Sequence, residues 1–210
     1  APGAAAHALD TRERATLTHV LVSHAHLDHT LGLPFLVTQR RLEIVGLRPA
    51  LDAVRESLFD GRIWPDLTEH ADWRELRGDE TLSIGDWTIE AGPADHTLPC
   101  VSYFCVAGEH RVAVLGDTRR TETVLAWTAD RRPTHCIVEC SFPDAMAEDS
   151  RRWGHQTPLD LPAWRAAVGP DCRLLVTHVK PMQESRVRAE CEALQDPALT
   201  LLQDGDVVVG

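Results

Sequence analysis

A dense cluster of metal-binding residue types directly follows an apolar run near the start of the chain. Residues 17–23 are typical of a buried strand, and His24, His26, Asp28 and His29 come next. Because side chains alternate along a strand, His24 and His26 point the same way, and the turn that follows aims Asp28 and His29 toward a neighbouring point. Imidazole and carboxylate suit Zn²⁺, Mn²⁺ or Fe, and no thiolate lies nearby. The cluster therefore predicts a catalytic metal site.

The composition is that of a globular chain with an excess of acid. The 210 residues fit one domain, and the net charge of -11 argues against binding long nucleic acid through the general surface. No stretch approaches the roughly 20 apolar residues that a membrane span needs, and residues 1–6 are not an intact signal peptide. We expect a cytoplasmic protein, with processed export left open. The six cysteines form no C-x-x-C pair and are interpreted as small hydrophobic residues.

Strand and helix patterns alternate along the rest of the chain. Turn residues predict hairpins around Gly85-Asp86, around Gly108, and around residues 204–206 between strands at 199–203 and 207–209. Further strands are expected at residues 42–46, 135–140 and 173–177, and helices at 49–59, 121–129, 159–168 and 184–194. Hairpins among crossovers indicate a layered α/β sandwich. On composition, residues 1–16 are expected to be flexible and 17–210 to form one domain.

Three later motifs carry further metal-binding residue types. His96 follows a predicted hairpin, Asp117 ends a predicted strand, and His178 follows another. In this order, the motifs and the first cluster resemble the signature of the metallo-β-lactamase superfamily. The resemblance implies the four-layer αββα metallo-β-lactamase sandwich. Because this chain reaches its first cluster after only 23 residues, we expect the N-terminal strands of that fold to be missing or shortened.

The resemblance also implies a centre of two divalent ions, with Zn²⁺ expected and Mn²⁺ or Fe as alternatives. The ligands of the first ion would be His24, His26, His96 and Asp117. The ligands of the second ion would be Asp28, His29, Asp117 and His178. Asp117 would bridge both ions, and two ions about 3.5 to 4 Å apart lower the pKa of a bridging water.

Other segments resemble one branch of the superfamily, the class II 3′,5′-cyclic-nucleotide phosphodiesterases. They are residues 58–67, 138–142, 154–157 and 177–181. Glu139 and His155-x-Thr157 also resemble the zinc-dependent tRNA 3′-processing endonucleases, where a His-Glu pair assists cleavage. Because both relatives cut phosphodiesters, that reaction class is better supported than either substrate.

The favoured function is a metal-dependent phosphodiesterase that hydrolyses cAMP or cGMP to the 5′-monophosphate through a metal-bridging hydroxide. His155, oriented by Glu139, would be the general acid for the leaving alkoxide. Asp28 would orient the nucleophile in addition to binding metal. Two alternatives stay open: an RNase Z-like tRNA 3′-processing endonuclease, which the acidic balance weakens, and an inactive metal-binding interaction protein.

The substrate contacts are the least constrained part of this interpretation. Lys180 would meet a phosphate oxygen or be a solvated charge, and Trp64 would stack on the base or anchor packing. Thr157 is the third candidate. The expected partner is a small cyclic nucleotide, with no long nucleic acid and no membrane, and a homodimer is a further expectation.

Overall fold

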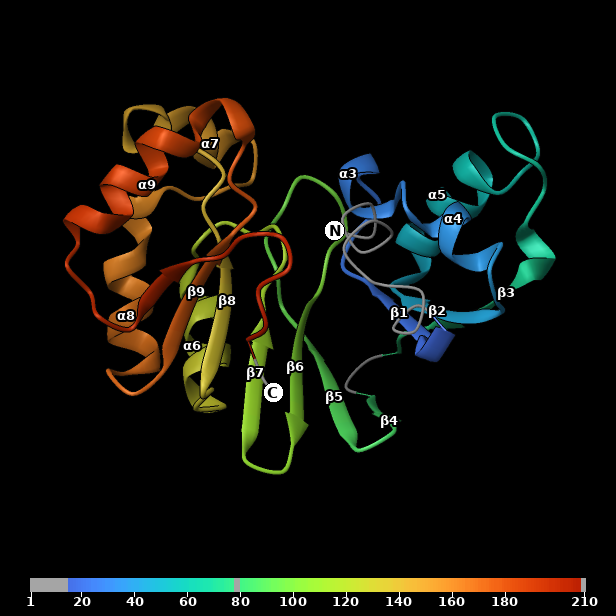
Figure 1. Cartoon of the computed structure of the whole chain (residues 1–210), viewed down its shortest axis with the longest axis horizontal. Coiled ribbons are helices and arrows are strands. Elements are labelled where there is room, and N and C mark those ends of the chain that lie inside the picture. Colours follow the sequence, from blue (N-terminus) through green and yellow to red (C-terminus); the bar gives the residue numbers. More distant parts are fainter. Residues whose placement is uncertain (1–14, 78–79, 209–210) are drawn as a thin grey trace. The chain divides into compact units, whose positions relative to one another are not determined.

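The computed structural model describes residues 15–77 and 80–208, which fall into two compact units. The N-terminal unit holds the described residues up to Glu80 together with Leu98–Cys100. The C-terminal unit holds Thr81–Thr97 and the described residues from Val101 onward. Figure 1 labels the elements of both. The predicted flexible segment 1–16 lies almost wholly outside the described residues, and the single domain over 17–210 stays a prediction.

The N-terminal unit is built on a parallel sheet of three strands. In the order of the sheet, these are β1 (His19–Val22), β2 (Leu42–Gly46) and β3 (Ala71–Glu75). Parallel neighbours need crossover connections, and helices supply them. They are α3 (Leu27–Thr30) and α4 (Leu33–Val37) before β2, and α5 (Arg48–Leu58) and η1 (Thr68–His70) before β3. The core joins sheet and helix side chains, including Ile44, Leu51 and Phe59.

The C-terminal unit is built on a mixed sheet of seven strands. In the order of the sheet, these are β10 (Leu199–Leu201), β9 (Arg173–Thr177), β8 (His135–Glu139), β7 (His110–Val114), β6 (Ser102–Ala107), β5 (Trp87–Gly92) and β4 (Thr81–Ile84). Neighbours from β4 to β7 run antiparallel and those from β7 to β10 run parallel. The carboxyl ends of β5, β7, β8 and β9 therefore meet at one edge of the sheet.

Helices of the C-terminal unit pack against this sheet. The longer ones are α6 (Glu122–Asp130), α8 (Leu161–Val168) and α9 (Glu184–Ala193). The shorter ones are η2 (Asp144–Met146), α7 (Ala147–Arg152), η3 (Pro158–Asp160) and η4 (Pro181–Gln183). Leu115, Val124, Val138, Trp164 and Val187 share one buried cluster, so the core lies between the strands and α6, α8 and α9 (Figure 1).

Most predicted elements are confirmed, and one hairpin is wrong. The strands at 42–46 and 173–177 have the predicted bounds, and β4–β5 and β6–β7 form the predicted hairpins. The predicted hairpin over 199–209 does not form within the described residues. The turn at Gly205 is present, but β10 pairs in parallel with β9, and residues 202–208 contain no strand. Leu202 N donates to Val176 O, so β9 takes up the backbone groups that a hairpin would have used.

The sequence patterns also missed β3. Its residues, Ala-Asp-Trp-Arg-Glu, are polar because β3 is an edge strand that buries little apart from Ala71. Charged residues hold its start, where Arg41 donates to both carboxylate oxygens of Asp72. Among the described residues, no helix is both long and apolar enough to cross a membrane.

Candidate metal centre

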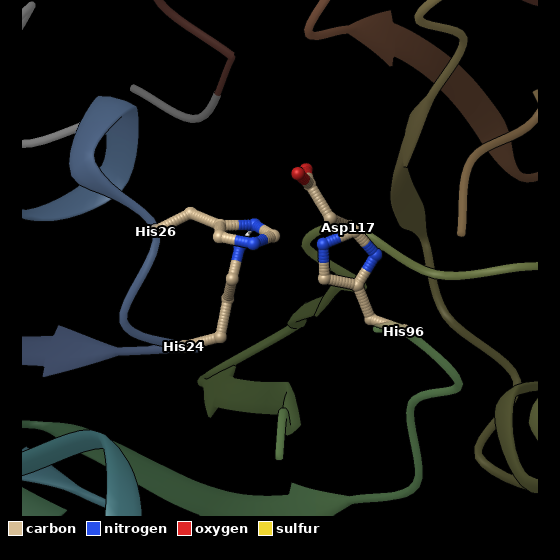
Figure 2. Close-up of side chains that lie close together, drawn as sticks. All are labelled: His24, His26, His96 and Asp117. Carbon is tan, nitrogen blue, oxygen red and sulfur yellow. Dashed lines mark hydrogen bonds between the residues drawn. The ribbon is translucent and has the colours of Figure 1, made fainter. Parts of the chain in front are cut away.

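The loop after β1 gathers imidazole rings in the N-terminal unit. His24 is fully buried, and its Nε2 lies 2.9 Å from Nδ1 of His26. Figure 2 shows these two side chains next to each other. The rings of His24 and His29 are 4.3 Å apart between centroids. Two nitrogens that both present lone pairs would repel at 2.9 Å. One of the two nitrogens therefore donates to the other unless both face a shared cation, and both arrangements suit rings that could bind a metal.

A short helix orients the rest of this loop. His29 N and Thr30 Oγ1 both donate to the carbonyl of His26, at 3.0 Å each. These bonds form the first turn of α3, so Asp28 and His29 lie on a helical turn directly after the two earlier histidines. Asp28 is exposed, and its Oδ2 lies 3.9 Å from Nε2 of His29.

The carboxyl edge of the seven-stranded sheet collects a second set of site residues. Asp117 follows β7 after Gly116 at φ +64°, and His178 follows β9 with its own φ at +62°. His155 comes from the segment after α7, and ligand atoms of Asp117, His155 and His178 lie within 4.8 Å of one another. A non-glycine residue at positive φ is strained, and strain of this kind clusters at functional sites.

His96 is held from behind by a backbone carbonyl. Its Nδ1 donates to the carbonyl of Gly154 at 2.9 Å, which leaves Nε2 to bind a metal. A Cβ at Gly154 would stand 2.4 Å from this Nδ1, so only glycine allows the approach. Ligand atoms of His96 and Asp117 lie within 4.8 Å of each other, and Figure 2 shows both side chains.

The predicted pairing of Glu139 with His155 is present. His155 Nδ1 lies 3.1 Å from Glu139 Oε1, which also accepts from Gln156 N at 3.1 Å. Burial raises the pKa of the Glu139 carboxyl, and the hydrogen bond from His155 opposes this effect. The next residue, Cys140, is fully buried, and this burial raises the pKa of its thiol well above the usual value.

Two supporting residues were missed by sequence reasoning. Ser141 Oγ contacts Glu139, His155 and His178, and its spacing of two from Glu139 at a strand end was the available signal. Arg119 pairs with Asp95 at 3.0 Å and donates from Nε to the carbonyl of Arg151, which ties together the segments beside His96 and His155. No pattern in the sequence indicates that clamp.

The three candidate substrate contacts have different surroundings. Lys180 Nζ lies 3.2 Å from Nε2 of His178. Trp64, in the N-terminal unit, is 41% exposed with its ring 5.2 Å from that of Phe35. Thr157 is 1% exposed at the start of η3. Their roles in substrate binding stay predictions, as do the ligand roles of the histidines and aspartates.

A family model described as beta-lactamase superfamily domain matches residues 2–179 of the chain. A Yersinia pestis protein named "Probable 3′,5′-cyclic-nucleotide phosphodiesterase" is 27% identical, over 69% of this chain and 49% of its own length. The 3′,5′-cyclic-nucleotide phosphodiesterase 1 of Saccharomyces cerevisiae is 25% identical, over 90% of this chain and 60% of its own. Ribonuclease Z of Thermobifida fusca is also 25% identical, over 90% of this chain and 76% of its own length. The chain thus spans about half to three fifths of the two phosphodiesterases.

Solved structures show the same fold. The metallo-β-lactamase fold protein YhfI of Bacillus subtilis superposes with a TM-score of 0.74 at 20% identity, over 92% of this chain and 77% of that one. The short form of human tRNase Z superposes with a TM-score of 0.65 at 17% identity, over 93% of this chain and 80% of that one. The matched model covers most of the chain, and the two superpositions cover more than nine tenths of it. The chain therefore belongs to the β-lactamase superfamily and has its metallo-β-lactamase fold.

Proposed function

We propose that this chain is a phosphodiesterase that opens 3′,5′-cyclic nucleotides to 5′-monophosphates with the help of two divalent metal ions. The observation that carries the proposal is the buried Glu139–His155 pair beside Asp117 and His178. Metal binding alone does not require a carboxylate-oriented histidine at this place. Cleavage of an ester with a poor leaving group does, because the departing alkoxide needs a proton.

The residues proposed to hold the ions are those that the sequence resemblance assigned. Histidine and aspartate are the donor types that suit Zn²⁺, with Mn²⁺ or Fe as alternatives. The fixed Nδ1 of His96 and the facing nitrogens of His24 and His26 support this assignment. When bound, such ions lower the pKa of a water molecule and neutralise charge on the attacking and leaving oxygens. The proposed ligands are His24, His26, Asp28, His29, His96, Asp117 and His178.

The proton for the leaving group comes from His155. Its Nδ1–H is committed to Glu139 Oε1, so Nε2 is the atom that can give a proton to the 3′-oxygen. The carboxylate keeps the ring in one orientation and stabilises the imidazolium charge before transfer. Lys180 is proposed to bind a phosphate oxygen and Trp64 to stack on the base, while Asp28 orients the nucleophile. Thr157, which is buried at the start of η3, stays a predicted substrate contact.

A tRNA 3′-processing endonuclease is the second candidate. It is favoured by the similarity to the ribonuclease Z of Thermobifida fusca, of which this chain covers 76%. The net charge of -11 favours the small substrate, since an overall excess of acidic residues disfavours a long anionic partner.

One sample tests both candidates. We expect purified protein to contain close to two equivalents of metal, to convert cyclic AMP or cyclic GMP to the 5′-monophosphate, and to leave precursor tRNA intact. Cleavage of precursor tRNA without turnover of either cyclic nucleotide would establish the second candidate. A folded protein that never exceeds one equivalent when supplied with Zn²⁺ or Mn²⁺ would refute the two-metal proposal, and failure to cleave bis(p-nitrophenyl) phosphate would indicate a binding protein.

A further inference from the structure

Ser141 stands between the buried carboxylate and two site histidines of the C-terminal unit. It is fully buried two residues beyond the end of β8, and its backbone N donates to Glu139 Oε2 at 3.0 Å. Its Oγ lies 2.8 Å from the same Oε2, 2.9 Å from His178 Nδ1 and 3.2 Å from His155 Nδ1. One hydroxyl thus contacts both rings and the carboxylate.

The number of protons decides how these contacts are used. A hydroxyl has one proton to donate, and an ionised carboxylate only accepts. Ser141 therefore donates to Glu139 Oε2, and its lone pairs are left to accept an N–H from a histidine. His155 Nδ1 has its own acceptor in Glu139 Oε1, so the ring that donates to Ser141 is His178, through Nδ1.

A contact on the other side of the His178 ring indicates the same tautomer independently. Lys180 Nζ lies 3.2 Å from Nε2, and an ammonium group can only donate. Nε2 therefore carries a lone pair, and the proton of the neutral ring lies on Nδ1. Asp117 Oδ1 also lies 3.2 Å from Nδ1, at ion-pair distance.

We propose that Ser141 is a positioning residue that relays the Glu139 carboxylate to His178 and fixes the Nδ1–H tautomer of that ring. The nitrogen with the lone pair is then Nε2, and a bound metal would take the place of the Lys180 ammonium there. Glu139 would in this way orient two histidines with different roles, His155 directly and His178 through Ser141. His178 needs such a restraint because its backbone is held at φ +62°. The inference rests on the proposed role of His178 as a metal ligand.

The chain offers a matched control for testing this relay. Ser150 is a fully buried serine of the same unit, on α7, and its Oγ has no hydrogen-bond partner among the described residues. Ser141→Ala and Ser150→Ala therefore each remove one buried hydroxyl, but only the first removes a contact to His178. The backbone bond from residue 141 to Glu139 is available in both variants.

The experiment combines two measurements on the full chain. Nitrogen chemical shifts of the histidine rings, recorded on metal-stripped protein, report the tautomer of His178, and titration with Zn²⁺ reports affinity. We expect Ser141→Ala to mix the two His178 tautomers and to weaken Zn²⁺ binding by about 10- to 100-fold, as is typical for loss of an outer partner of a ligand. Ser150→Ala should leave both unchanged, and Ser141→Thr, which keeps the hydroxyl, should restore the tautomer.

Three results would overturn the proposal. The first is a Ser141→Ala protein that keeps the Nδ1–H tautomer, which would assign the orientation to Asp117. The second is an equal loss of Zn²⁺ affinity in Ser150→Ala, and the third is a Ser141→Thr protein that folds but behaves like the alanine variant. Failure of the proposed function, in which His178 is a metal ligand, can be recognised separately. In that case His178→Ala would leave Zn²⁺ binding intact, while the effect of Ser141→Ala on the His178 tautomer would still be observed.

Discussion

The two units present their histidines in different ways. In the N-terminal unit, three histidines within six residues lie ring against ring, with His24 in contact with both His26 and His29. In the C-terminal unit, His96, His155 and His178 come from distant segments. Each has a ring nitrogen beside an oxygen of a carbonyl, a carboxylate or a hydroxyl. The first three histidines are neighbours because they belong to one stretch of sequence, whereas the other three come together only once the sheet has formed.

The backbone differs in the same sense. Gly116, Gly154 and His178 of the C-terminal unit are all at positive φ, next to or within the candidate site. The β1 loop instead leads into a helical turn with ordinary dihedral angles at both caps of α3. The C-terminal set therefore depends on two glycines in a conformation that other residues rarely adopt and on one strained residue, His178, so it should be the more sensitive to small substitutions.

The largest expected effect is that of Asp117→Ala. Asp117 is proposed to bind both ions, so its loss should lower the occupancy of both and reduce turnover to background. Elemental analysis and cyclic AMP hydrolysis measure the two effects. Asp117→Asn, which keeps the shape but not the charge, should behave similarly. Retention of two metals with near-native activity would show that the N-terminal histidines hold the ions without this carboxylate.

His155→Ala should have the second largest effect, a loss of hydrolytic activity whose size depends on the leaving group. General acid help is typically worth on the order of 10² to 10⁴ in rate, and most when the leaving group is poor. The rate of cyclic AMP hydrolysis should decrease by a factor in this range, while the rate of bis(p-nitrophenyl) phosphate hydrolysis should change far less. Metal content should stay the same. Equal losses on both substrates would point to a structural role for the ring, and loss of metal would make His155 a ligand.

Gly154→Ala should have an intermediate effect that tests the dependence on positive-φ glycine directly. Alanine at φ +86° costs about 1–3 kcal/mol of stability, and its Cβ would also meet His96 Nδ1 at 2.4 Å. Gly169→Ala is the matched control, because Gly169 has φ +84° with nothing within 4 Å of a new Cβ. Both should lower the melting temperature, but only Gly154→Ala should weaken Zn²⁺ binding, by about 10- to 100-fold. Equal Zn²⁺ affinities would show that the His96 contact does not govern binding.

The same contrast between the units explains how far the sequence could be interpreted. The cluster after β1 was predictable because its spacing alone brings the histidines together. Asp117 and His178 were assigned through the family resemblance, which places such residues after recognisable strands. The contacts of Ser141 and Arg119 were not, since both depend on segments that meet only in the folded sheet. The wrong hairpin after residue 199 has a similar cause, because local turn residues cannot reveal that β9 is the better partner for β10.

The smallest effect is expected in the N-terminal unit, from Thr30→Val. Thr30 is 1% exposed, and its Oγ1 donates to the carbonyl of His26, so the variant removes one buried hydrogen bond at nearly constant shape. Such a bond contributes about 0.5–1.5 kcal/mol to the free energy of unfolding.

Thr38→Val provides the comparison for this last variant. Thr38 Oγ1 donates to the carbonyl of Phe35 at the same 3.0 Å, at an exposed position away from the candidate ligands. Denaturant unfolding should show a larger loss for Thr30→Val than for Thr38→Val. Zn²⁺ affinity should fall by less than the 10-fold expected for outer partners in the C-terminal unit, because His29 N still holds the His26 carbonyl. A loss as large as that of Gly154→Ala would mean that the N-terminal loop is no less dependent on its supports, and the contrast between the two units would fail.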